Sequence, residues 1–187
     1  MNTAPLRERE EASYVRALEF EREGNFSKAL REINRALEKD PQNAEYLWRK
    51  GFYLSGIGRL EEAVVTYKAS FEKKRDESVA FCIADILASL GRYTESEKYA
   101  YFVVKKHPSY VPGLRLMTEI ELMLWRLDNA EKCIASLEKQ GEDVVEFRCE
   151  LARRRPLFLE GQLNRLGGMR NHVYLKTGGI LTGTGAE

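Results

Sequence analysis

The stretch G-R-L-E-E-A at residues 58–63 decides the fold, because close versions of it recur along the chain. G-N-F-S-K-A begins at Gly24, G-R-Y-T-E-S at Gly91 and W-R-L-D-N-A at Trp125, so the separations are 34, 33 and 34 residues. A fixed period of this length is typical of repeat proteins, in which each repeat is one supersecondary unit. The chain of 187 residues therefore holds about four such units.

Each position of the recurring stretch has a physical role in a pair of helices. The glycine follows an apolar periodic run, where a helix end needs a left-handed residue. Leu60 and its equivalents begin a second helix, and Ala63 marks a place where two helices approach closely. Pro41 and Pro108 then end the second helix of their units. The expected helix pairs are 10–23 with 26–39, 43–57 with 60–73, 77–90 with 93–106, and 111–124 with 127–139.

These motifs resemble the tetratricopeptide repeat family over roughly residues 10–140. The resemblance implies an all-α, right-handed solenoid with units at about 10–41, 44–75, 77–108 and 111–140. Three positions depart from the pattern. Trp125 replaces the turn glycine, Glu121 stands where the family has a large apolar residue, and Arg75 replaces the closing proline of the second unit.

Residues 142–155 form a further amphipathic segment that would close the exposed last unit as a capping helix. Its apolar residues Val144, Phe147 and Leu151, together with Cys149, would face inward. Its arginines, Arg148 and residues 153–155, would face solvent at a helix C-terminus, where the helix dipole favours cations.

The composition changes in the tail at 156–187, which holds 7 of the 14 glycines. Leucines at 159, 163 and 166 have helical spacing and precede Gly167-Gly168, after which residues 172–185 alternate with a period near 2, as in a hairpin or added strand. A disordered end and a docking segment both remain open. The apolar residues that would make such a contact are Leu157, Phe158, Val173, Tyr174, Leu175, Ile180 and Leu181.

The resemblance also implies that the first helix of each unit lines a concave face. Aligning the units on the small residue places Tyr14, Trp48, Phe81 and Arg115 at one equivalent position. Leu18, Phe52, Asp85 and Glu119 follow one turn later. Aromatic rings in register would anchor an apolar peptide, so we expect a binding groove at Tyr14, Leu18, Trp48, Phe52, Phe81, Asp85 and Arg115. Packing of the same rings inside the array remains the alternative.

Composition excludes several other classes of function. The net charge of +1 gives no basic surplus for nucleic acid, and no apolar run approaches the length of a membrane span. Three widely spaced cysteines suit a reducing cytoplasm and a role as small core residues. Neither histidine belongs to a metal-binding or catalytic motif. We therefore expect a cytoplasmic protein without enzymatic activity, cofactor or metal.

The sequence predicts a module that binds an apolar segment of another protein in its concave groove. One alternative is a structural subunit of a larger assembly, joined or self-associated through its tail. A narrower alternative comes from residues 81–100, which are similar to class II chaperones of type III secretion.

Overall fold

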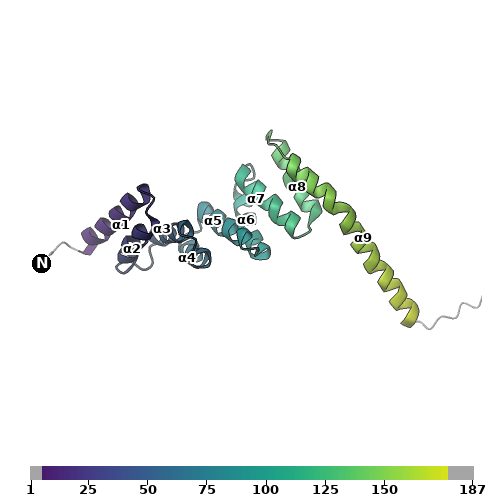
Figure 1. The fold of residues 1–187 in the computed structure, drawn as a ribbon, viewed down its shortest axis with the longest axis horizontal. Coiled ribbons are helices and arrows are strands. Elements are labelled where there is room, and N and C mark those ends of the chain that lie inside the picture. The colour runs from purple at the N-terminus through teal and green to yellow at the C-terminus, as the bar shows by residue number, and fades with distance from the viewer. Residues whose placement is uncertain (1–5, 177–187) are drawn as a thin grey trace, which may run out of the picture.

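The computed structural model describes the backbone of residues 6–176 and the side chains of residues 12–162. Helices follow one another along the described chain as a row of hairpins (Figure 1). They are α1 (Leu6–Arg22), α2 (Phe26–Leu37), α3 (Ala44–Gly56), α4 (Leu60–Lys73), α5 (Glu77–Ser89), α6 (Tyr93–Lys106), α7 (Val111–Met123), α8 (Leu127–Glu138) and α9 (Val145–Lys176). The all-α repeat architecture expected from the sequence is confirmed.

The turn inside each hairpin has the left-handed backbone that the repeat pattern predicts. Gly24, Gly58 and Gly91 have φ of +71°, +79° and +73°. Trp125 occupies the same place in the fourth unit with φ of +59°, a conformation that is strained for any residue with a side chain. The local geometry is therefore kept in the fourth unit although its residue type is not.

Neighbouring helices pack in sequence, each against the one before and the one after. The small residue of each unit lies at the contact inside the hairpin and is fully buried, as Ala29, Ala63, Ser96 and Ala130. The Ser96 hydroxyl donates a hydrogen bond of 2.6 Å to the carbonyl of Ala84, so even the polar member of this set is satisfied. These contacts bring the helices close enough to form a continuous core.

The core consists of three adjoining clusters of buried side chains. The first spans α1 to α5, the second α5 to α7, and the third α7 to α9. Leu54 and Leu87 stand at equivalent positions in α3 and α5 and are 2% and 0% exposed. Glu121 takes the same position in α7 and is 2% exposed, so a carboxyl group occupies a leucine site.

The last helix differs from its prediction. We expected a capping helix that ends at Arg155, but α9 continues through Pro156 to Lys176 and extends away from the hairpins (Figure 1). Contacts on both sides of Pro156 stabilise this continuation. Arg154 donates a hydrogen bond to the carbonyl of Leu122, and Phe158 packs against the third cluster. These tertiary contacts outweigh the local preference of proline to end a helix.

The inward and outward faces of α9 are also partly different from the prediction. Val144 and Leu151 are buried as expected, whereas Cys149 is exposed. Arg153 is exposed as expected, but Arg148 pairs with Glu138 at 2.7 Å and Arg155 pairs with Glu131 at 2.7 Å. Arg154 is mostly buried. The arginines therefore fasten α9 to the last hairpin.

The predicted strand pattern in the tail is wrong for residues 172–176, which are helical. Extending an existing helix adds one hydrogen bond per residue fixed, whereas a new hairpin must first close a loop. Val173, Tyr174 and Leu175 therefore lie on the α9 backbone. The other predicted tail residues, Ile180 and Leu181, lie outside the described residues.

Candidate functional site

The predicted groove residues fall on the first helices of the four units, at the positions expected from the repeat. Tyr14 and Leu18 lie on α1, Trp48 and Phe52 on α3, Phe81 and Asp85 on α5, and Arg115 on α7. They do not form one continuous ladder. The structure divides them into an N-terminal group on α1 and α3 and a C-terminal group on α5 and α7.

The aromatic rings of α3 are largely engaged in packing. Trp48 and Phe52 are both half-buried and stack with their centroids 6.4 Å apart. Phe52 also meets Phe26 edge to face at 5.6 Å, and both rings of α3 pack against the first core cluster. The guanidinium of Arg49 lies 4.5 Å from the centre of the Trp48 ring. These contacts favour the packing alternative for Trp48 and Phe52.

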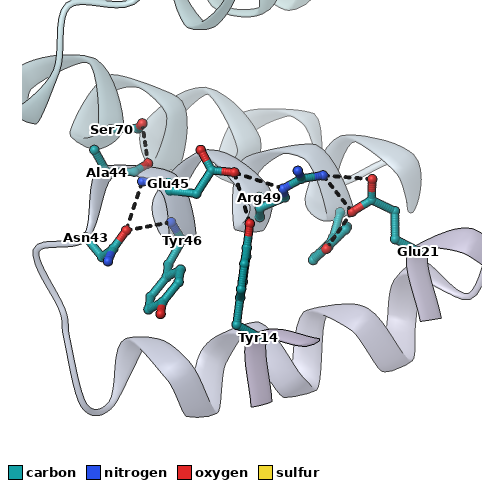
Figure 2. Close-up of polar contacts among 9 residues, drawn as sticks. Tyr14, Glu21, Asn43, Ala44, Glu45, Tyr46, Arg49 and Ser70 are labelled. Atoms are coloured by element: carbon teal, nitrogen blue, oxygen red, sulfur yellow. Dashed lines mark hydrogen bonds and ion pairs between the residues drawn. The ribbon is translucent and has the colours of Figure 1, made fainter. Parts of the chain in front are cut away.

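A polar network joins α1 to α3 (Figure 2). The Tyr14 hydroxyl donates to Glu45 at 3.2 Å, and Arg49 donates to Glu45 at 3.1 Å and to Glu21 at 2.9 Å. Tyr53 donates to Glu21 at 2.7 Å. Burial and this hydrogen bond raise the pKa of Tyr53 above its ordinary value. The network fixes α1 on α3 and makes this part of the surface charged instead of apolar.

Sequence reasoning missed this network. The i, i+4 spacing of Glu45 and Arg49 on one helix could have indicated an ion pair. Glu21 lies one unit earlier in the sequence, so its contact with Arg49 needs the packing of α1 on α3 and has no local signal.

The C-terminal group opens onto a cavity of about 640 Å³ between α5, α7 and the first part of α9, which we call the C-terminal groove. The groove is lined by Phe81, Asp85, Pro112, Arg115, Leu116, Glu119, Leu122, Met123, Glu146, Phe147, Cys149, Glu150, Arg153 and Arg154. Three of the predicted residues, Phe81, Asp85 and Arg115, line this groove. The first part of α9 also lines it, which the sequence did not indicate.

The groove has an apolar floor and a charged rim. Phe81 is half-buried and meets Tyr110 edge to face at 5.7 Å. Met123 is 39% exposed, and Phe147 is half-buried beneath the Arg115 guanidinium, which lies 5.2 Å from its ring centre. The charged residues that the sequence places at the C-terminal end of the concave face, Asp85, Arg115 and Glu119, line the groove, and α9 adds further charged side chains to it.

The electrostatics of the rim follow from its local partners. Arg115 donates to the carbonyl of Asp143 at 3.1 Å. Arg153 pairs with Glu150 at 2.6 Å, and Arg154 pairs with the same carboxylate. Burial raises the pKa of the Asp85 carboxyl above its ordinary value. The groove can thus hold apolar side chains on its floor and polar groups along its edges.

The predicted tail contact residues separate into two kinds where side chains are described. Phe158 packs against the third core cluster, whereas Leu157 is 56% exposed on the adjacent face of α9. Within residues 12–162 we find no group of acidic, histidine and cysteine side chains arranged to hold a metal ion. In the described part of the chain, every helix is too short or too polar to cross a membrane.

No protein-family model matches the chain. Among curated proteins, it is similar to the protein O-mannosyl-transferase Tmtc3 of Drosophila melanogaster, with 30% identity over 107 residues, 56% of this chain and 12% of that protein. It is also similar to tetratricopeptide repeat protein 37 of Xenopus laevis, with 27% identity over 146 residues, 75% of this chain and 9% of that protein. The chain thus spans about a tenth of the length of these relatives.

Solved structures share the architecture at low sequence identity. A tetratricopeptide repeat protein from Parabacteroides merdae matches with a TM-score of 0.72 and 17% identity, over 92% of this chain and 68% of that one. YrrB, described as a TPR protein with an unusual peptide-binding site, matches with a TM-score of 0.65 and 16% identity, over 68% and 66%. The repeat spacing, the left-handed hairpin turns and these likenesses together show that the chain has the helical-hairpin repeat fold of these tetratricopeptide repeat structures.

Proposed function

We propose that this chain is a non-enzymatic interaction module that binds a segment of another protein in its C-terminal groove. The observation that carries the proposal is the groove itself, in which three helices surround about 640 Å³ of open space. Met123 and Phe147 remain partly exposed on its floor, so a partner could bury apolar area there. A groove with apolar anchors and a polar rim suits an extended or helical peptide.

The likeness to YrrB supports this proposal at the level of the fold, since that protein is described as having a peptide-binding site. The position of the site differs from our expectation of a groove along all units. Trp48 and Phe52 are engaged in packing, and Arg49 of the α1–α3 network lies over the Trp48 ring. We therefore place peptide binding on α5, α7 and α9.

Two of the three cysteines, Cys82 and Cys133, support the non-enzymatic part of the proposal. Burial raises the pKa of the Cys82 thiol above its ordinary value and that of Cys133 to about 11. Both thiols are therefore protonated near neutral pH, whereas a nucleophilic cysteine needs a lowered pKa. Their environments are those of small core residues.

The test is selection of binding peptides from a displayed library against the full chain, followed by titration of the selected peptides. Met123→Glu places a charge on the groove floor and should weaken binding at least about tenfold, because burial of an apolar anchor is replaced by burial of a charge. The matched control is Val65→Glu on α4, outside the groove, where the side chain is 69% exposed.

Val65→Glu should leave the affinity unchanged. If both variants bind like the original chain while remaining folded by circular dichroism, the peptide site is not in the C-terminal groove. If both lose binding equally, the charge acts without regard to position and the groove assignment is wrong.

A second candidate function, assembly through α9, rests on a separate observation. Leu157 and Leu159 are 56% and 52% exposed on α9, directly after Pro156. The two leucines are two positions apart and face different sides of the helix, so a second copy of α9 could bury either of them. Sedimentation equilibrium would then show a dimer that Leu157→Glu with Leu159→Glu dissociates, and a concentration-independent monomer would contradict it. The narrower likeness to secretion chaperones and the cytoplasmic location stay predictions.

A further inference from the structure

The charged groups of the C-terminal groove are not equally satisfied. Asp85 on α5, Glu119 on α7 and Glu146 on α9 each line the groove, and none of the three has a cationic partner among the described side chains. Asp85 and Glu119 occupy equivalent positions on the first helices of neighbouring units. The groove therefore brings together three carboxylates from three separate helices.

The cations of the groove are already engaged elsewhere. Arg115 bonds the Asp143 carbonyl at 3.1 Å and lies 3.9 Å from Glu142. Arg153 and Arg154 share the carboxylate of Glu150. Arg154 also donates to the Leu122 carbonyl and lies 5.3 Å from the Trp125 ring centre. None of these three arginines neutralises Asp85, Glu119 or Glu146.

The three carboxylates are exposed to solvent, but they line one groove without counter-charges of their own. Desolvation disfavours the charged form, and like charges on adjacent helices repel each other. Asp85 shows the first effect, because burial raises the pKa of its carboxyl. A cationic group of a ligand placed among the three carboxylates would relieve both effects. The same carboxylates would disfavour negatively charged ligands.

We propose that the C-terminal groove binds a basic amphipathic protein segment. Its apolar side chains lie on the floor formed by Phe81, Met123 and Phe147. Its lysine or arginine side chains pair with Asp85, Glu119 and Glu146. This inference rests on the proposed function, and it adds the charge of the partner to it. An acidic segment would add negative charge to an uncompensated rim, and a neutral one would leave the carboxylates unpaired.

The test uses three synthetic amphipathic peptides with identical leucine positions. They differ only at their polar positions, which hold Lys, Gln or Glu. Fluorescence anisotropy measures the affinity of each peptide for the full chain at low and high salt. We expect the Lys peptide to bind about tenfold or more tightly than the Gln peptide, and the Glu peptide to bind most weakly. High salt should reduce the difference between Lys and Gln, since exposed ion pairs are screened.

Charge reversal on the protein makes the test specific to the groove. Asp85→Lys with Glu119→Lys should reverse the order, so that the Glu peptide binds more tightly than the Lys peptide. The matched control is Glu61→Lys with Glu72→Lys, which changes the net charge equally at two exposed positions on α4, outside the groove. This control should keep the original order of affinities.

The outcomes separate the charge inference from peptide binding itself. Equal binding of the Lys and Gln peptides, lost in both cases on Met123→Glu, would overturn the basic partner and retain the groove. Equal effects of the two double variants would overturn the inference by showing that only net charge matters. Failure of all three peptides to bind, or binding of the Gln peptide that Met123→Glu does not weaken, would overturn the groove as well.

Discussion

At the scale of single residues, Trp125 shows how a fold can keep a turn after losing its glycine. The backbone amides of Trp125 and Arg126 donate to the carbonyls of Leu122 and Glu121, at 3.1 and 2.8 Å. The first unit has the same pair of bonds, from Gly24 to Glu21 and from Asn25 to Phe20. The Trp125 ring is 42% exposed and lies 5.3 Å from the Arg154 guanidinium. A ring contact with α9 thus accompanies the strained backbone.

Two substitutions separate the strain from the ring contact. Trp125→Ala loses the contact and keeps a side chain at positive φ, whereas Trp125→Gly loses the contact and relieves the strain. We expect the glycine variant to be more stable than the alanine variant by about 1 kcal/mol in urea denaturation. Equal stability of the two would show that the backbone of this turn relaxes without cost.

Glu121 is a second residue whose environment should affect a measurable property, the pH dependence of stability. Burial is the largest effect on the pKa of its carboxyl and raises it above the ordinary 4.5, and the charge of Glu97 adds to this increase. The Asn129 amide at 3.5 Å and the charge of Arg126 lower the pKa by less, so it remains raised. The net upward direction means that the folded chain binds this proton more tightly than the unfolded chain. Stability from this group is therefore full below pH 4.5 and falls as the pH rises through the folded-state pKa.

Glu121→Leu restores the residue type found at Leu54 and Leu87 and removes this titration. The variant should be more stable than the original chain by about 1–3 kcal/mol near neutral pH. Its advantage should be smallest in acid and should grow as the pH rises above 4.5. Urea denaturation at several pH values measures this difference, and a pH-independent difference would contradict the assignment.

At the scale of elements, α9 is held by contacts that lie on both sides of Pro156. Phe158 packs on the third core cluster, while Leu157 beside it is 56% exposed. Phe158→Ala should lower the free energy of unfolding by about 1–2 kcal/mol, since only part of the ring is buried. Leu157→Ala serves as the matched control.

Leu157→Ala should change stability by less than about 0.5 kcal/mol. Urea denaturation followed by circular dichroism compares the two variants directly. Equal and small effects would mean that α9 does not pack on the last hairpin beyond Pro156.

At the scale of the whole molecule, the sequence was sufficient for the repeat architecture. The spacing of Gly24, Gly58 and Gly91 located the turns because a left-handed turn has few alternatives to glycine. Helices α2 to α8 begin and end within two residues of their expected bounds. Local rules of this kind suffice where each helix contacts only its neighbours in sequence.

The concave face was less predictable because it depends on contacts between units. The alignment of the repeats put Trp48 and Phe81 at equivalent positions. In the structure, however, Trp48 packs on Phe52, whereas Phe81 lines the C-terminal groove. The continuation of α9 through Pro156 depends on Phe158 and Arg154, which act through contacts distant in sequence. The local sequence patterns around proline and glycine predict instead that this helix ends.

The most direct measurement is a titration of the isotope-labelled full chain with the Lys peptide, followed by nuclear magnetic resonance of the backbone amides. If the C-terminal groove is the binding face, saturable shifts should concentrate on α5, α7 and the first turns of α9, with little change on α2 and α4. Shifts concentrated on α1 and α3, or on the helices α2 and α4, would contradict the groove as the site of recognition.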